Sequence, residues 1–158
     1  MAFQFLTGPI LQTTGYLSLI IINFIGCASI IFPVPNFLSV FTMGAVMNPF
    51  LVALFSSIGA AFGELIGYGV GYGGKRVIKR GDKHIKRAKR WMKEHSGFLV
   101  IIIFSATPLP TDIIGILCGA MKYDIKKFFL AVWIGRFLMY LVLAYAGYYG
   151  ITWVTKII

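Results

Sequence analysis

The stretch "SATPLPTDIIGILCGA", residues 105–120, interrupts an apolar run with two prolines and one acidic residue. Proline lacks a backbone donor and disfavours helix at the residue before it, so we expect the chain to bend between residues 107 and 112. The flanking segments, 97–107 and 113–121, are each about half as long as the roughly 20 residues that cross a bilayer. One kinked span, or a hairpin that turns inside the membrane, would fit this pattern.

The composition indicates that this chain is surrounded by lipid rather than by water. Of its 158 residues, 58% are hydrophobic and 13% are charged, against roughly 25% charged in soluble domains. The mean hydropathy is +0.83, and residues 1–63 contain no Asp, Glu, Lys, Arg or His. The sequence therefore predicts one all-α integral membrane domain over residues 1–158, multi-pass in the cell membrane. No Lys or Arg precedes Lys75, so we expect no cleavable signal peptide.

The positive charge is concentrated in one segment, residues 75–96. It holds ten Lys and Arg against two acids, a local net charge of +8. Between membrane segments such a run indicates a cytoplasmic loop rather than a nucleic-acid-binding surface. Its apolar residues recur at helical spacing, which favours a basic helix lying on anionic lipid. The cations expected to contact lipid are Lys83, Lys86, Arg87, Lys89 and Arg90.

The bend belongs to an internal repeat. Pro33-Val34-Pro35 recurs 75 residues later as Pro108-Leu109-Pro110, and Gly44 recurs as Gly119. At offset 76, Gly59 and Gly71 recur as Gly135 and Gly147. The two copies cover about residues 22–74 and 97–150, and each ends in a 26-residue apolar segment, 49–74 and 125–150. At about 1.5 Å per residue, both are long enough to cross a membrane.

Charge favours the hairpin over the kinked span. The basic segment precedes the second break and Lys122, Lys126 and Lys127 follow it, so both ends prefer the cytoplasm. We therefore predict a re-entrant hairpin with Pro108 and Pro110 at its tip. A matching hairpin with Pro33 and Pro35 at its tip should enter from the other face, which makes the units inverted copies around a cavity.

The N-terminal part leaves two alternatives. Residues 15–32 are long enough to span the membrane fully. Strict repetition instead makes residues 22–32 the first arm of hairpin one and residues 3–16 a surface helix. No charge lies nearby to fix the side on which the N-terminus resides.

Three features of the sequence are assigned no catalytic or binding role. Gly59, Gly63, Gly67 and Gly71 lie four residues apart, which is typical of close helix packing. Cys27 and Cys118 belong to no Cys/His cluster, so we expect no metal and no cofactor. "GVGYGGKR", residues 69–76, matches a phosphate-binding loop by chance, because Arg76 replaces its Ser or Thr and no strand precedes it.

Three ionisable residues remain inside the apolar segments: Glu64, Asp112 and Arg136. Each would cost about 2.5–3.5 kcal/mol at the centre of a membrane helix. Glu64 lies 11 residues before Lys75 and Arg136 lies 10 residues after Lys126, which places both at similar depth near the midplane. A purely structural ion pair is one interpretation of this placement.

A binding site is the other interpretation. Glu64 and Tyr68 share one helix face, Arg136 and Tyr140 share the corresponding face, and the repeat brings the two faces together. A midplane carboxylate and guanidinium framed by tyrosines suit an anion coupled to a proton. Asp112 at the hairpin tip is a candidate proton relay towards solvent, and a turn-capping role fits it equally well.

"IGAAFGELIGYGVGYGGK", residues 58–75, resembles the G-x3-G-[D/E]-x3-Y-x2-G-x2-G pattern of the DedA (SNARE-associated, VTT-domain) membrane proteins. Residues 104–136 are similar to their second hairpin and following helix, closest to the short YqaA-like subgroup. The resemblance covers about residues 30–150. It implies inverted hairpins and the flipping or scrambling of lipids, including polyprenyl-phosphate carriers, linked to protons. Glu64 matches the family's acidic residue. Asn36 and Phe37 replace an acid common in the first hairpin, and Thr111 and Asp112 replace a basic residue common in the second.

Taken together, the residues and the resemblance predict a proton-linked flippase or scramblase of an anionic lipid. Its expected partners are membrane lipids and protons, with no nucleic acid, and a homo-oligomer is compatible with the sequence. A non-transporting scaffold and an ion-coupled solute transporter are the alternatives. We expect no enzyme, because no Ser/His/Asp set, HExxH or DDxxD motif occurs and both histidines lie in the basic segment.

Overall fold

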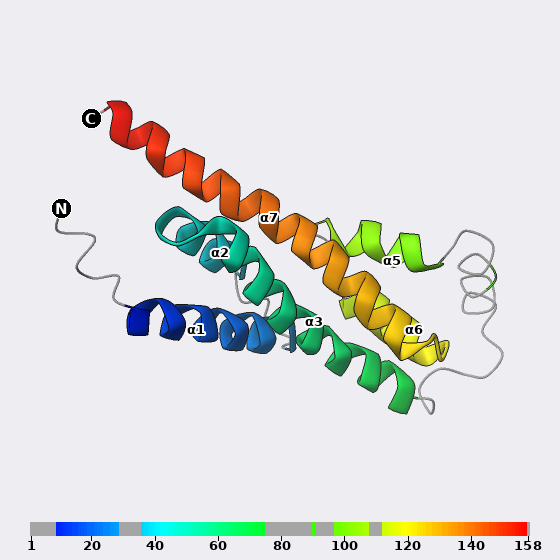
Figure 1. The fold of residues 1–158 in the computed structure, drawn as a ribbon. Coiled ribbons are helices and arrows are strands. Elements are labelled where there is room, and N and C mark those ends of the chain that lie inside the picture. The colour runs from blue at the N-terminus through cyan, green and yellow to red at the C-terminus, as the bar shows by residue number, and fades with distance from the viewer. Residues whose placement is uncertain (1–8, 29–35, 75–89, 91–96, 108–111, 158) are drawn as a thin grey trace.

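The fold is given by a computed structural model that describes residues 9–28, 36–74, 90, 97–107 and 112–157, with side chains undescribed at 9–12, 112–113 and 151–157. All elements in these residues are α-helices, as the sequence predicts. They are α1 (Pro9–Ala28), α2 (Asn36–Val46), α3 (Pro49–Gly73), α5 (Gly97–Ser105), α6 (Asp112–Ala120) and α7 (Ile125–Ile157) (Figure 1).

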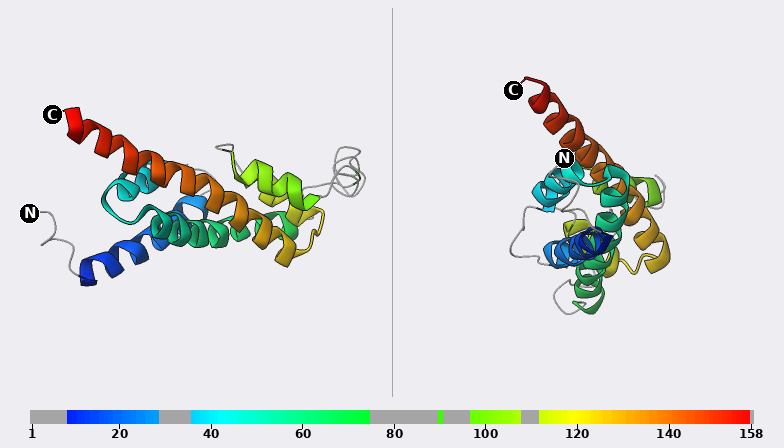
Figure 2. Two further views of the ribbon diagram at one scale, coloured as in Figure 1. Left: turned by 45° about the horizontal axis from the view of Figure 1, so that its top comes forward. Right: turned by 60° about the vertical axis from the view of Figure 1, so that its left-hand side comes forward.

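The two longest helices, α3 and α7, lie side by side and run in opposite directions (Figures 1 and 2). Their segments Pro49–Gly73 and Ile125–Gly150 are long and apolar enough to cross a membrane. The prediction of two long apolar segments at these positions is confirmed.

The first turns of α3 and α7 are capped in the same way. The side chain of Asn48 accepts a hydrogen bond of 3.0 Å from the backbone nitrogen of Phe50, and Asp124 accepts one of 2.9 Å from that of Lys126. Such caps satisfy backbone donors that have no partner inside the helix. The two capping residues are 76 positions apart, so the cap belongs to the repeat.

The change of the repeat offset from 75 to 76 falls between α6 and α7. There Lys122 adopts a left-handed conformation with φ of 54°, and the following amide of Tyr123 bonds to the carbonyl of Cys118. This is how helices commonly end when the chain must turn sharply. The extra residue of the second copy is therefore accommodated in a turn and does not disturb the helices.

The four shorter helices pack on the two long ones in an alternating pattern. Helices α1 and α6 pack on α3, whereas α2 and α5 pack on α7. Helix α5 runs away from the end of the molecule where α7 begins, and α6 returns to it (Figure 1). Each pair α1–α2 and α5–α6 is thus split between the two long helices.

The first helix contradicts the alternative of a surface helix over residues 3–16 followed by a hairpin arm over residues 22–32. Helix α1 is unbroken from Pro9 to Ala28, so there is no separate surface helix ending at residue 16 and no arm beginning at residue 22. The physical reason is that no proline lies between Pro9 and Pro33. Residues 3–8 and 29–32 lie outside the described residues.

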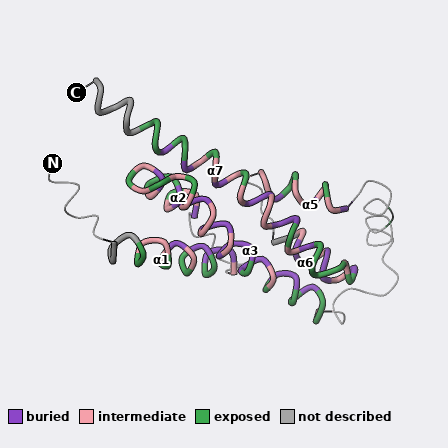
Figure 3. The backbone as a smooth tube through the Cα atoms, in the orientation of Figure 1, coloured by how far each residue is buried: buried purple, intermediate pink, exposed green. Residues whose placement is uncertain are grey.

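Each end of the molecule has its own apolar core. One cluster joins α3 and α7 to α1 and α2, and the other joins them to α5 and α6. The outward faces carry exposed apolar side chains, such as Val142, which is 70% exposed (Figure 3). An apolar exterior around two tightly packed cores suits a lipid solvent.

Candidate functional site

An ion pair joins α3 to α7 between the two apolar clusters. The Nη2 atom of Arg136 donates a hydrogen bond to Oε1 of Glu64 at 2.5 Å, and the two side chains are 6% and 1% exposed. Both residues lie near the middle of the two segments that are long and apolar enough to cross a membrane. The structure thus brings together the two charged residues that the sequence placed at equal depth.

The helical spacing of α3 and α7 builds this contact. On α3, Val52, Ser56, Ala60 and Glu64 recur every four residues and are all buried. On α7, the matching buried stripe is Val132, Arg136, Tyr140 and Ala144. Residues four apart share a helix face, so two antiparallel stripes meet with the charges near their crossing.

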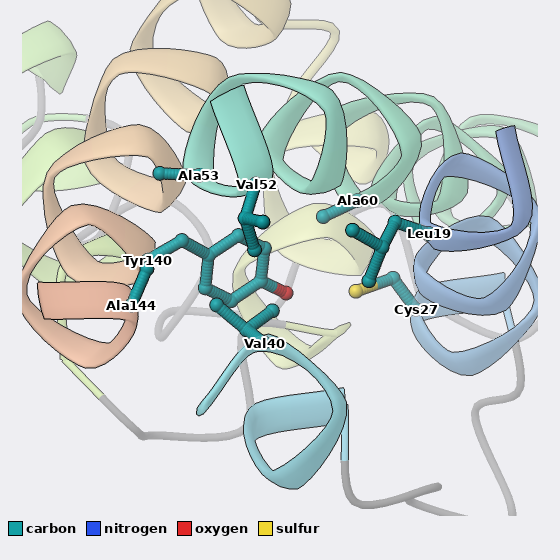
Figure 4. Close-up of a cluster of buried hydrophobic side chains, with 8 residues drawn as sticks. All are labelled: Leu19, Cys27, Val40, Val52, Ala53, Ala60, Tyr140 and Ala144. Carbon is teal, nitrogen blue, oxygen red and sulfur yellow. The ribbon is translucent and has the colours of Figure 1, made fainter. Parts of the chain in front are cut away.

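Polar groups of α1, α2 and α7 lie beside the ion pair. The amide nitrogen of Asn36 donates a hydrogen bond of 3.5 Å to the thiol of Cys27. Tyr140 points its hydroxyl toward the same sulfur (Figure 4). Cys27 and Tyr140 are within electrostatic reach of Glu64 and Arg136. The pair therefore lies in a small polar region inside an otherwise apolar cluster.

Four buried polar atoms on the helices around this region have no hydrogen-bond partner among the described residues. They are Oδ1 of Asn23, Oδ1 of Asn36, Oγ of Ser56 and Oη of Tyr140, one from each of α1, α2, α3 and α7. Most buried polar groups in proteins are hydrogen-bonded, and an exception calls for an explanation. Sequence reasoning assigned no role to Asn23, Asn36 and Ser56. The helical spacing could have identified two of them. Asn23 lies one turn before Cys27 and Ser56 lies two turns before Glu64, so each shares a helix face with a residue of the polar region.

Tyr68 is directed elsewhere. Its hydroxyl donates a hydrogen bond to the carbonyl of Tyr123 in the turn before α7, and its ring packs against Phe128 at 5.1 Å between centroids. It belongs to the cluster of α5 and α6, one turn beyond Glu64. In this conformation Tyr68 connects α3 to the turn, and its hydroxyl does not meet the ion pair.

The glycines spaced four residues apart on α3 contact two different helices. Cβ atoms at Gly59 and Gly63 would collide with the backbone of α1, whereas one at Gly71 would collide with the carbonyl of Ile116 in α6. Gly67 lies next to Gly115 of α6. The stripe lets two short helices approach α3 closely.

The remaining candidate residues are only partly described. Asp112 is the first residue of α6, and its side chain is not among those described. Arg90 is exposed. The hairpin-tip residues Pro33, Pro35, Pro108 and Pro110, and the cations Lys83, Lys86, Arg87 and Lys89, lie outside the described residues. Within the described ranges, no three His, Cys, Asp or Glu side chains are grouped as a metal site.

Comparison of the sequence with known proteins finds one matching domain family and two relatives. The sequence model of the VTT domain matches residues 34–149. An uncharacterized protein of Methanocaldococcus jannaschii is 34% identical over 89 residues, which cover 54% of this chain and 55% of that protein. The vacuole membrane protein KMS1 of Arabidopsis thaliana is 37% identical over 57 residues, 34% of this chain and 14% of that protein. The chain thus spans about half of the first relative and much less of the second. No solved structure matches it.

Proposed function

Because the chain belongs to the VTT-domain family, a family of membrane proteins, we propose that it is a transporter of anionic lipids that works as a proton-linked flippase or scramblase. The observation that carries the proposal is the buried Glu64–Arg136 pair between two antiparallel, membrane-length helices. Ionisable groups at such depth are costly and usually serve transport or proton movement.

The proposal treats the two units as inverted copies, and equivalent contacts support this. Gly119 of α6 meets the backbone of Tyr68 in α3, and Gly44 of α2 meets the backbone of Ala144 in α7. The glycines are 75 residues apart and their partners are 76 apart. One contact is therefore the repeat of the other.

A second pair of contacts repeats in the same way. Gly71 of α3 meets the carbonyl of Ile116 in α6, and Gly147 of α7 meets the carbonyl of Phe41 in α2. The offsets are again 76 and 75. Since α3 and α7 run in opposite directions, a two-fold axis across them would exchange the units. Transporters often bind their substrate where such repeats meet.

The ion pair occupies one half of a symmetric contact. By the repeat, Glu64 corresponds to Tyr140 and Arg136 corresponds to Ala60. Ala60 and Tyr140 share the cluster of α1 and α2, while the equivalent contact holds the two charges. The charged contact and its uncharged counterpart would therefore lie on either side of the two-fold axis.

In the proposed topology, both hairpins are re-entrant and enter from opposite faces. Residues 75–96 are then cytoplasmic, and the chain is a multi-pass protein of the cell membrane. The splitting of each hairpin between α3 and α7 supports this arrangement, because its two arms then pack on long helices that run in opposite directions.

The proposed mechanism uses competition for Arg136. An incoming anionic headgroup contacts the guanidinium and displaces the Glu64 carboxylate, which then takes up a proton. When the headgroup leaves, Glu64 releases the proton and the pair forms again. Asp112, at the start of α6, would relay the proton towards solvent. The cycle needs no metal, no nucleotide and no chemical step on the lipid.

A reconstitution assay tests this function. The full chain is placed in liposomes that carry fluorescent lipids in both leaflets, and dithionite is added outside. We expect faster loss of inner-leaflet fluorescence than in protein-free liposomes, for anionic more than zwitterionic lipids, and a rate that changes with a pH gradient. Rates equal to those of protein-free liposomes for every lipid would favour the scaffold alternative.

A further inference from the structure

The six described helices can be divided into two groups of three, called bodies below, although the long helices of the two groups, α3 and α7, also pack extensively on each other. Body one consists of α1, α3 and α6, and body two consists of α2, α5 and α7, since each short helix packs mainly on the long helix of its own body. Both hairpins connect one body to the other. The plane between them, where α3 meets α7 and α2 meets α1 and α3, is called the seam below.

Within each body the helices interlock through their backbones. Gly59 meets the carbonyl of Ile20 in body one, and Gly135 meets the carbonyl of Ile102 in body two. The same holds for every described glycine that lies against the backbone of another helix: its neighbour belongs to its own body. Contacts of this kind leave no room for sliding, so each body should behave as a rigid unit.

Across the seam, in contrast, the described contacts involve a side chain on at least one side, as where the side chain of Asn36 in α2 lies against Gly26 in α1. The rings of Phe62 and Phe129 are 5.2 Å apart, and those of Phe50 and Phe137 are 5.8 Å apart. The ion pair and the bond from Asn36 to the Cys27 thiol also cross the seam. Side-chain contacts can exchange partners without a change in the helices.

Both bodies contribute to the four unpartnered polar atoms named above. Asn23 and Ser56 come from body one, and Asn36 and Tyr140 come from body two. Their helix neighbours Cys27, Ala60 and Val40 pack in the cluster that both bodies share (Figure 4). Packing alone does not account for four buried polar atoms without partners among the described residues, because apolar side chains would serve it better.

We propose that the seam is the path of the lipid headgroup: the two bodies part there, and Asn23, Ser56, Asn36 and Tyr140 bind the polar atoms of the headgroup beside Arg136. This proposal rests on the proposed function and adds a moving boundary and four binding residues to it. In the closed arrangement the side-chain oxygens of these four residues have no partner among the described residues. The headgroup would supply their hydrogen bonds.

Two buried serines of α3 offer a matched test of the binding residues. Ser56 has no partner among the described residues, whereas the hydroxyl of its neighbour Ser57 donates to the carbonyl of Leu54. Ser56→Ala should slow lipid transport while thermal stability stays equal or rises. Ser57→Ala should leave transport unchanged. Equal transport by the parent and Ser56→Ala would exclude Ser56 from the path.

Cross-linking tests the moving seam. Cysteines at Phe62 and Phe129 join the two bodies, and cysteines at Tyr16 and Phe55 join α1 to α3 within body one, with ring centroids also 5.2 Å apart. Each pair is linked in proteoliposomes with a short bifunctional thiol reagent, so folding precedes linking. The parent, whose Cys27 and Cys118 are buried, is treated identically as the reference.

The link across the seam should reduce transport to the level of protein-free liposomes, and reduction of the link should restore it. The link within body one should have no effect. Transport that survives the link across the seam would overturn the proposal.

A distance measurement separates this proposal from the proposed function. Spin labels at Val70 and Val142, on exposed faces of bodies one and two, should give two distances in liposomes, whereas labels at Leu17 and Val70, both in body one, should give one. If the parent moves no lipid but the first pair still gives two distances, the two bodies do part at the seam, whereas the proposed function and the headgroup path along the seam are wrong. A single distance for the first pair at acidic and neutral pH would overturn the seam.

Discussion

At the residue scale, the Glu64–Arg136 pair places two charges at 2.5 Å with almost no exposed surface. Such a pair is a weak source of stability, because removing both charges from water offsets most of their attraction. Its retention in an apolar molecule therefore suits a functional role better than a structural one.

Substitution can separate stability from function at this pair. Arg136→Leu should destabilise the protein by about 3–5 kcal/mol, because Glu64 would lose the buried charge that compensates it. The double variant Glu64→Leu/Arg136→Leu should recover most of that loss, since apolar replacement of a whole buried pair is often neutral or better. Denaturation followed by circular dichroism measures both.

Transport should be absent in the single and the double variant alike. If the double variant is as unstable as Arg136→Leu, Glu64 and Arg136 must make stabilising contacts with other residues besides each other. A double variant that transports like the parent would remove the pair from the mechanism.

The meeting of these two residues could be predicted because charges are rare in this chain and the repeat fixes their register. The polar atoms of Asn23, Asn36 and Ser56 could not be singled out in the same way. A neutral polar residue in an apolar helix often bonds to its own backbone, as the amide nitrogen of Asn23 does with the carbonyl of Leu19. Whether the side-chain oxygen of Asn23 also has a partner depends on the neighbouring helices.

At the element scale, glycines set how closely the helices approach, and two of them on α3 form a matched pair. Gly71→Ala should destabilise the protein by about 1–3 kcal/mol, because the new Cβ would collide with the backbone of Ile116. Gly69→Ala, where nothing lies within 4 Å, should stabilise the helix by up to about 1 kcal/mol. Thermal unfolding of the two variants checks this, and changes of the same sign would contradict the packing interpretation.

The breaks between elements follow from particular residues. Helices α5 and α6 lie on either side of Pro108 and Pro110, where the sequence predicts a bend. The capping role of Asp124 and the left-handed turn at Lys122 were not predicted, although Asn48 and Asp124 occupy matching positions. A single inserted residue shifts the register there, and only the backbone conformation shows which residue absorbs it.

At the scale of the whole molecule, the inverted arrangement makes a topological prediction. Single cysteines at His95 and Lys122, before and after the second hairpin, should react with an impermeant thiol reagent from the cytoplasmic side. A cysteine at Met47, which the repeat pairs with Lys122, should react from the opposite side. Labelling of His95 and Lys122 from opposite sides would contradict the re-entrant hairpin.

The measurement that tests the account most directly is the pH dependence of lipid transport by Glu64→Gln. Glutamine preserves the size and a hydrogen-bond acceptor for Arg136 but cannot exchange a proton. We predict that this variant folds, inserts and no longer shows pH-dependent transport in proteoliposomes, while the parent does. If Glu64→Gln transports anionic lipid as the parent does, with the same dependence on pH, the proposed exchange at Glu64 and Arg136 is wrong.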